Sequence, residues 1–272
     1  RALFLETARY WKSRFTWEET KGQYSSFFVK GPDEYCGAAI NNTYTNYLAR
    51  YNVELALRYS ADMMDEQERE ALRFFADHIA ILYDPERHLY KQDELFDRME
   101  PLPGHRDAGE PLYRTICFDR MQRYQVLKQA DLVQLMVMFP ERFTEKEKLA
   151  VWRTYEPLTV HDSSLSFGVH ALLAFQLGLQ EQGWDYFRRA LFFDLRDELG
   201  NTGREGIHMA ALGAAWQALV YGALGVWTDG ETLRTDPHLP EAIRSVSLPL
   251  WFHGVRYRMT ADHHQIRMVE EE

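Results

Sequence analysis

The sequence predicts a mainly α-helical fold, in which helical hairpins form a ring, followed by the start of a small β-sheet domain. Two observations lead to this prediction. Segments with one apolar face alternate along the chain with segments that are apolar almost all round, and strand-like alternation begins after residue 230. We therefore expect residues 1–230 to form one helical domain and residues 231–272 to begin a β-rich one.

The expected elements follow in chain order. A helix at 1–12 precedes a hairpin at 14–30, where a Lys-Gly turn joins two aromatic runs. Seven more helices are expected, which makes eight in all. They cover 41–59, 65–82, 125–139, 144–155, 165–177, 180–195 and 206–226. A long irregular stretch with four prolines, residues 83–124, separates the second of these seven from the third.

The expected helices are of two kinds. LKQADLVQLMVMF, SFGVHALLAFQLG and GIHMAALGAAWQALVYGALGV are apolar almost all round and belong in an interior, whereas the helices between them have a polar face. After residue 230, SLPLWFHGVRYRMTADHHQIRMVEE alternates like strands, with turns expected at His253-Gly254 and around Ala261-Asp262.

Composition bounds the class of protein. With 272 residues, 46% hydrophobic and 14% aromatic, the chain can build a sizeable core. Its net charge of −10 and the lack of a basic run argue against nucleic acid or an anionic membrane as the main partner. No apolar run approaches the roughly 18 residues of a membrane span.

Cys36 and Cys117 form no metal or redox motif and are expected to be buried thiols of a cytoplasmic protein. Because the chain begins inside an amphipathic helix without Met, we expect a fragment of a longer protein.

Polar residues gather where the inner helices begin. Clusters at 41–46, 128–131, 161–166 and 201–208 each precede or open such a helix. Parallel inner helices would bring these clusters to one mouth, beside the turn at 31–35. Structural alternatives exist for single residues: the serines and asparagines as helix caps, Lys128 as a solvated lysine, and His208 as a core histidine.

The chemistry that these clusters favour combines an anion with a polyol. Helix N-termini, serine hydroxyls and a histidine are suited to phosphate, and Lys, Gln, Asn and Tyr are suited to sugar hydroxyls. The adjacent carboxylates Asp33 and Glu34 diverge, so they do not form the acid–base pair of an inverting hydrolase, which is about 6.5–9.5 Å apart. If phosphate were the nucleophile, one protonated carboxyl would suffice.

Five blocks occur in order: GPDEY, NNTYTNYLARYN, KQAD, TVHDSSLS and GNT…EGIHMAALGAAW. Together they resemble glycoside hydrolase family 65, a family dominated by inverting phosphorylases of maltose, trehalose, kojibiose and related α-glucosides, over about residues 1–260. The resemblance implies an (α/α)6 barrel, of which the chain would hold about eight of twelve helices, between an N-terminal β-sandwich and a small C-terminal sheet. It also implies a homodimeric full-length protein and neither a metal nor an organic cofactor.

The resemblance also implies roles for particular residues. Glu34 would be the general acid, and Lys128 and Gln129 would bind the glucose unit that is cleaved. Ser163, Ser164 and His208 would bind phosphate. Three residues would support these sites: Asp33 and Tyr35 beside the sugar, and His161 beside the phosphate. The expected reaction is phosphorolysis of an α-linked glucose disaccharide to β-glucose 1-phosphate and a free sugar.

Two other functions stay open. The first is a hydrolase on the same fold, of the acid trehalase kind, with Glu205 as the base that activates water. The second is a carbohydrate-binding protein without turnover. No motif in the sequence identifies the acceptor sugar. We expect the stretch 83–124 to contribute to the specificity for the acceptor.

Overall fold

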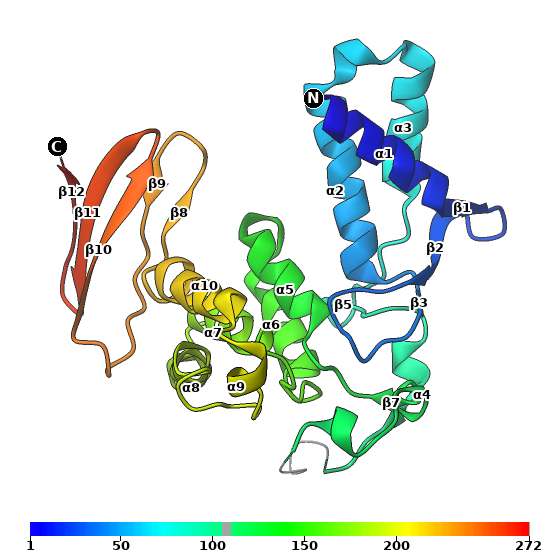
Figure 1. Ribbon diagram of the computed structural model, residues 1–272. Coiled ribbons are helices and arrows are strands. Elements are labelled where there is room, and N and C mark those ends of the chain that lie inside the picture. The colour runs from blue at the N-terminus through cyan, green and yellow to red at the C-terminus, as the bar shows by residue number, and fades with distance from the viewer. Residues whose placement is uncertain (105–109, 272) are drawn as a thin grey trace. The chain divides into compact units, whose positions relative to one another are not determined.

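The computed structural model describes residues 1–104 and 110–271. These residues fall into two compact units, 1–135 with 149–160, and 136–148 with 161–272. The expected mainly helical fold with C-terminal strands is confirmed (Figure 1). In the part of the chain that the structure describes, no helix is both long and apolar enough to cross a membrane.

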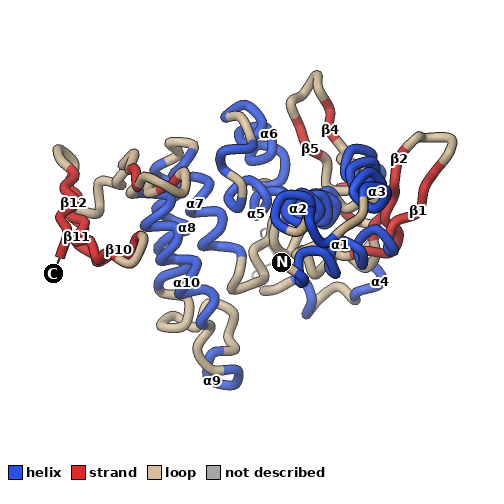
Figure 2. Tube along the Cα trace, turned by 90° about the horizontal axis from the view of Figure 1, so that it is seen from above, coloured by secondary structure: helices blue, strands red, loops and turns tan. Residues whose placement is uncertain are grey.

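Three helices and a hairpin build the core of the first unit. Helices α1 (Ala2–Arg14), α2 (Thr43–Tyr59) and α3 (Glu66–His78) pack together in both views (Figures 1 and 2). Their shared core is apolar: Leu5, Ala8, Ala49, Val53, Ala56, Leu72 and Phe75 are all buried. The expected hairpin is confirmed as β1 (Phe15–Glu18) and β2 (Gln23–Val29), with β3 (Ala39–Ile40) pairing along β2.

The stretch expected to be irregular holds only short elements. They are β4 (Tyr83–Asp84), β5 (Leu89–Tyr90), η2 (Phe96–Arg98), β6 (Glu100–Pro101), η4 (Leu112–Arg114), α4 (Phe118–Met121) and β7 (Tyr124–Gln125). Residues 105–109 of this stretch lie outside the described residues. Two further helices, α5 (Asp131–Met138) and α6 (Glu145–Tyr155), each contribute residues to both units.

In the second unit, helices pack against one another, and a sheet packs against the segment that continues α10. Helix α7 (Ser166–Gln176) is buried almost all round, as expected, and packs on α8 (Gln180–Leu191) and α10 (Met209–Gln217). A π-helical turn, η6 (Ala218–Ala223), continues α10. Its Val220 and the following Leu224 pack under the antiparallel sheet β10 (Ser245–Phe252), β11 (Val255–Asp262) and β12 (Ile266–Glu271). The expected turn at His253-Gly254 joins β10 to β11. A short hairpin, β8 (Trp227–Thr228) with β9 (Leu233–Arg234), precedes the sheet, and the four-residue α9 (Thr202–Glu205) precedes α10.

Three expected helix ends are wrong, and in two of them a tertiary hydrogen bond takes a backbone group that a longer helix would need. The helix expected at 65–82 ends at His78, since the N–H of Ala80 donates to Tyr24 O at 3.0 Å. The helix expected at 125–139 begins only at Asp131, since the Leu127 N–H donates to Leu158 O. Helix α8 ends at Leu191, not at residue 195.

The last expected helix, at 206–226, also differs. Its α-helical part begins at Met209, because the His208 N–H donates to the Asp194 carboxylate at 2.9 Å. The expected burial on all sides is wrong for this helix, since Met209, Leu212 and Trp216 are exposed.

Candidate active site

The GPDEY turn places its two carboxylates in different environments. Asp33 is 2% exposed, whereas half of the Glu34 side chain is exposed. The Asp33 Oδ1 accepts hydrogen bonds from the backbone N–H of Tyr35 at 3.1 Å and of Lys128 at 2.8 Å. The turn therefore offers one carboxylate to the surface and uses the other inside the protein.

Glu34 lies against the two residues expected to hold the glucose unit. Its Oε2 forms an ion pair with the Lys128 ammonium, and its Oε1 accepts from Gln129 Nε2 at 3.3 Å. Partial burial acts to raise the pKa of Glu34, but the hydrogen bonds and charge of Lys128 and Gln129 outweigh it and lower the pKa. The alternative of Lys128 as a solvated lysine is wrong, because its side chain is mostly buried and is paired with Glu34.

Gln129 and Tyr35 fix the turn from two sides. The Gln129 Nε2 also donates to Pro32 O at 2.6 Å. Its Oε1 is buried and accepts no hydrogen bond from the described residues. Tyr35 is 6% exposed and packs in a small core cluster with Met121 and Val126. Its burial indicates an anchor for the turn.

Asp131 joins this cluster although it was expected only as part of the KQAD block. Its Oδ1 accepts from the Asp33 N–H at 2.5 Å. Its Oδ2 accepts from Asn42 Nδ2 at 2.7 Å and from Gln92 Nε2 at 2.9 Å. An aspartate at the start of a helix is common for reasons of the helix dipole alone, so the sequence did not single it out. Gln92 comes from the irregular stretch and belongs to no motif.

The two asparagines before α2 have structural roles. Asn42 is the N-cap of α2, and its Oδ1 accepts from the Thr45 N–H at 3.0 Å. Asn41 has a left-handed backbone conformation, with φ of 55°, and its Oδ1 accepts from the Ser26 N–H at 2.9 Å. The capping alternative is therefore confirmed for Asn42, and Asn41 is fully buried between strand and helix.

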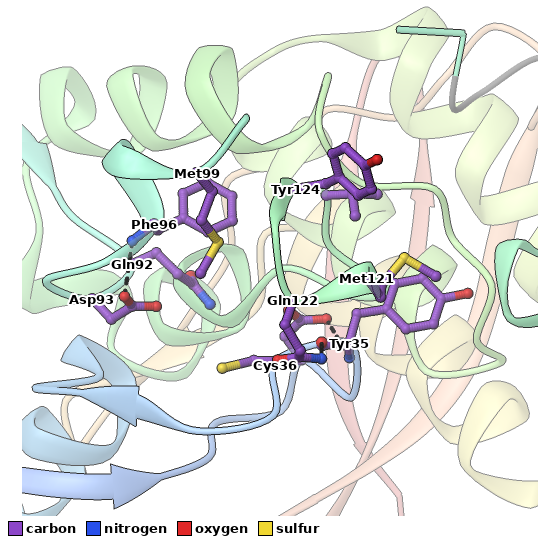
Figure 3. Close-up of a pocket in the computed structure, with 11 residues that line it drawn as sticks. Tyr35, Cys36, Gln92, Asp93, Phe96, Met99, Met121, Gln122 and Tyr124 are labelled. Atoms are coloured by element: carbon purple, nitrogen blue, oxygen red, sulfur yellow. Dashed lines mark hydrogen bonds between the residues drawn. The ribbon is translucent and has the colours of Figure 1, made fainter. Parts of the chain in front are cut away.

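A small cavity lies on the inner side of the turn (Figure 3). Its volume is about 10 Å³, roughly the room that one water molecule needs, so no sugar fits there. Cys36 lines it, and burial raises the pKa of this thiol to about 12, which makes it a poor nucleophile. Cys36 is only half-buried and Cys117 is exposed, so neither cysteine is the fully buried thiol that was expected.

The expected phosphate ligands Ser163 and Ser164 lie in the loop before α7. Ser163 is buried, and its Oγ accepts from the Leu165 N–H at 3.2 Å. Ser164 is half-buried. Leu165 occupies the N-cap position of α7 and forms no side-chain cap hydrogen bond. The alternative that these serines cap the helix is therefore wrong for α7.

His161 is enclosed by the protein. Its backbone is left-handed, with φ of 60°, and its ring stacks on Phe167 with 5.3 Å between centroids. Nδ1 lies 2.8 Å from Ser166 Oγ, and Nε2 lies 3.1 Å from the Tyr186 hydroxyl. With both ring nitrogens at protein hydroxyls, His161 is placed to support the loop that carries the serines.

His208 stands at the N-cap position of α10 and is held by Asp194. Nδ1 lies 2.6 Å from Asp194 Oδ1, and Nε2 lies 4.0 Å from the Glu205 carboxylate. Burial acts to raise the pKa of Asp194, but the hydrogen bonds from His208 outweigh it and lower the pKa. The His208 side chain is 16% exposed, so it is no fully buried core histidine.

The structure brings the expected residues together in two groups. Asp33, Glu34, Tyr35, Lys128 and Gln129 form one cluster in the first unit. In the second unit, Phe193 contacts both the Phe167 ring beside His161 and the His208 ring. That all four polar clusters share one mouth is a prediction that spans both units and stays a prediction. Within the described residues, no group of three or more His, Cys, Asp or Glu side chains is arranged to hold a metal ion.

The chain is similar to proteins of known activity. It is 30% identical to the maltose phosphorylase of Bacillus subtilis (strain 168) and 34% identical to the kojibiose phosphorylase of Escherichia coli (strain K12), over 97% of the chain in each case. It is 30% identical to the alpha,alpha-trehalose phosphorylase of Thermoanaerobacter brockii over 99% of the chain. The chain spans only 36–38% of the length of these three relatives.

A solved structure and two family profiles agree with these relatives. A protein from the human microbiome that carries the provisional name of kojibiose phosphorylase superposes with a TM-score of 0.89 at 27% identity. The match covers 99% of this chain and 39% of that one. The profile of the glycosyl hydrolase family 65 central catalytic domain matches residues 1–217, and that of the family's C-terminal domain matches residues 227–272. The chain therefore belongs to glycosyl hydrolase family 65.

Proposed function

We propose that the protein to which this chain belongs catalyses inverting phosphorolysis of an α-linked glucose disaccharide, giving β-glucose 1-phosphate and a free sugar. One observation carries the proposal: the Glu34 carboxylate touches both Lys128 and Gln129, so the proposed acid lies at the proposed glucose ligands. The names of the relatives, which are phosphorylases of maltose, kojibiose and trehalose, support the same reaction class.

The proposed reaction needs one acid and one nucleophile. An oxygen of inorganic phosphate attacks the anomeric carbon, and the bond from that carbon to the glycosidic oxygen breaks. Glu34 transfers its proton to the departing oxygen, so that the acceptor leaves as a neutral sugar. Ser163, Ser164 and His208 hold the phosphate, with His208 oriented by Asp194. Attack from the face opposite the leaving group inverts the configuration from α to β.

The ion pair with Lys128 has a consequence for this mechanism. In the free protein the pair lowers the pKa of Glu34 and keeps it ionised, whereas a general acid must carry a proton. We propose that the bound glucose unit takes over the hydrogen bonds of Lys128 and Gln129. Losing these donors would raise the pKa of Glu34, and a sugar that covers the exposed half of the side chain would raise it further by desolvation.

Further features of the whole protein belong to the same proposal. The helical residues 1–230 would form part of an (α/α)6 catalytic barrel, and residues 231–272 would begin the C-terminal β domain. The chemistry requires neither a metal nor an organic cofactor, because phosphate supplies the nucleophile and Glu34 the proton. The full-length protein is expected to be a homodimer, which light scattering would test.

An assay of the full-length protein on α-linked glucose disaccharides, with and without inorganic phosphate, tests the proposal. Phosphate-dependent release of β-glucose 1-phosphate, identified by the anomeric coupling in proton NMR, is the expected result. Turnover that ignores phosphate, or α-glucose 1-phosphate as product, would contradict it. Sugar binding without any turnover would indicate a carbohydrate-binding protein instead.

A hydrolase is the second candidate, because Glu205 lies within 4.0 Å of His208 Nε2 and is exposed. In that case Glu205 would activate water. Changing Ser163 and Ser164 together to Ala separates the two functions. A phosphorylase should show a KM for phosphate raised about 10²- to 10⁴-fold, because two hydrogen bonds to a charged ligand are lost and each is worth about 1.5–3 kcal/mol. A hydrolase should keep its turnover, and the exposed Ser13→Ala serves as the matched control.

A further inference from the structure

Two buried aspartates join the GPDEY turn at residues 31–35, here called the acid turn, to the KQAD segment at residues 128–131. They do so by reciprocal hydrogen bonds. The Asp131 carboxylate accepts from the backbone N–H of Asp33 at 2.5 Å, and the Asp33 carboxylate accepts from the backbone N–H of Lys128 at 2.8 Å. Each side chain thus binds the backbone of the other segment, across more than 90 residues of sequence. Two such bonds in opposite directions restrict both sliding and rotation of one segment against the other.

Asp131 is also tied to the rest of the first unit. Its Oδ2 accepts from Asn42 at the start of α2 and from Gln92 in the irregular stretch. A Cβ at Gly31 would overlap the Asp131 carboxylate, so the Gly-Pro turn passes directly over it. Four segments therefore meet at one fully buried carboxylate, and the turn needs glycine at this point because of the close approach.

From this arrangement we infer that Asp131 is a positioning residue for the proposed acid, fixing Glu34 against Lys128 and Gln129 through the backbone of the acid turn. The inference rests on the proposed function. Asp131 is 0% exposed, so it has no access to a substrate and acts only through the backbone and side chains it holds. Asp33 is its counterpart on the turn.

The hydrogen bonds also assign the charge within the pair. Both oxygens of Asp131 accept from N–H donors, three in all, which is the pattern of an ionised carboxylate. Burial, and then the neighbouring charge of Asp131, raise the pKa of Asp33 to about 8. At neutral pH the pair thus holds one proton, on Asp33, and one negative charge, on Asp131.

This charge assignment makes Asp131→Asn the sharpest variant. An asparagine has one acceptor oxygen, so its NH2 group must face either the Asp33 N–H or the two amide donors on the other side. The acid turn should then loosen. We expect kcat of phosphorolysis to fall about 100-fold, as a displacement of about 1 Å at a reacting group can cost, with little change in the KM for phosphate. Asp77→Asn, an exposed aspartate on α3, is the matched control.

A second variant and a second measurement guard against misfolding. Gly31→Ala pushes on the Asp131 carboxylate without removing it, and should give the same pattern of lowered kcat. Hydrogen–deuterium exchange followed by mass spectrometry measures the stability of the reciprocal hydrogen bonds of Asp33 and Asp131, and it needs no turnover. Peptides that cover 31–35 and 127–130 should lose protection in both variants, while those of α3 keep theirs.

The outcomes separate the inference from the proposed function. If the wild-type protein showed no phosphate-dependent turnover, the proposed function would fail. The exchange measurement would still test whether Asp131 holds the acid turn in place. If the wild type were active and both variants kept its kcat and its protection at 31–35, the positioning role of Asp131 would be refuted. Should Asp131→Asn not fold, Gly31→Ala alone decides between these results.

Discussion

Glu34 and His208 are each held by one charged partner, but the two partners stand in different relations to the proposed chemistry. Lys128 meets Glu34 at the carboxylate that must carry the proton, and Lys128 is itself a proposed glucose ligand. Asp194 meets His208 at Nδ1, which leaves Nε2 directed toward Asn201 and Glu205. In the proposed mechanism the contact between Glu34 and Lys128 must open during the reaction, whereas the contact between His208 and Asp194 can persist throughout.

This difference teaches that a charged partner has a different effect depending on which atom of the side chain it contacts. A partner at the reactive atom, as Lys128 is for Glu34, sets the charge of that side chain in the free protein, and in the proposed mechanism the substrate displaces it. A partner on the far nitrogen of a histidine fixes the tautomer and the ring orientation. Four changes test the contrast, ordered by the size of the expected effect.

The largest effect is expected for Glu34→Gln, which removes the proton donor and keeps the shape. Its kcat/KM on a disaccharide should fall about 10³-fold, within the usual range for loss of a general acid. Most of the loss should be absent with α-glucosyl fluoride, whose leaving group needs less protonation. The exposed Glu70→Gln is the control. An equal loss on both substrates would indicate that Glu34 has another role.

Lys128→Met comes next, because it removes a glucose ligand and the partner of Glu34 together. We expect kcat/KM to fall about 100-fold, which corresponds to charge-assisted hydrogen bonds of about 1.5–3 kcal/mol each. Without the ammonium the pKa of Glu34 in the free protein rises, so the alkaline limb of kcat/KM should move to higher pH. An unmoved limb would show that Lys128 does not set the charge of Glu34, and exposed Lys146→Met is the control.

A smaller effect is expected for Asp194→Asn. The variant weakens the hold on His208, so the KM for phosphate should rise about tenfold, while the pH profile of kcat/KM keeps its Glu34 limb. Steady-state kinetics at varied phosphate measures both. Asp185→Asn, an exposed residue of α8, should behave as wild type. If the alkaline limb of the kcat/KM profile moved in Asp194→Asn, Asp194 would affect the charge of Glu34, and the proposed difference between the two pairs would be wrong.

The smallest effect on turnover and the clearest one on stability are expected for Asp33→Asn. Since burial raises the pKa of Asp33 from its usual 3.8 to about 8, the native state keeps a proton that the unfolded chain loses. The free energy of unfolding should therefore fall as the pH rises from about 4 to about 8, by up to about 1.4 kcal/mol per pH unit. Urea unfolding of Asp33→Asn should show a shallower slope, and an unchanged slope would mean that Asp33 does not hold the proton.

The parts of the fold that repeat a local pattern were predictable. The hairpin at 14–30 follows from its Lys-Gly turn, and α7 follows from a run of residues that is apolar on all sides. Two of the helix boundaries that failed are those where a distant residue takes a backbone group: Ala80 donates to Tyr24, and His208 donates to Asp194. No local pattern carries that information.

The candidate site divides in the same way. Glu34, Lys128 and Gln129 were expected to serve one sugar and do lie in contact. Asp131 and Asp194 were not singled out, because their importance comes from the backbone amides of Asp33 and His208, which any residue could offer. Gln92 was hidden for the same reason, since it reaches Asp131 from a stretch without periodicity.

The pKa of Glu34 with and without bound sugar tests the proposed mechanism most directly. Carbon-13 NMR of labelled glutamate carboxyls, with the Glu34 resonance assigned by its absence in Glu34→Gln, gives the value in both states. In the free protein the pKa should lie below that of an ordinary glutamate, and it should rise above it when glucose is bound. A pKa that stays low with glucose bound would contradict the role of Glu34 as an acid released from Lys128 by the substrate.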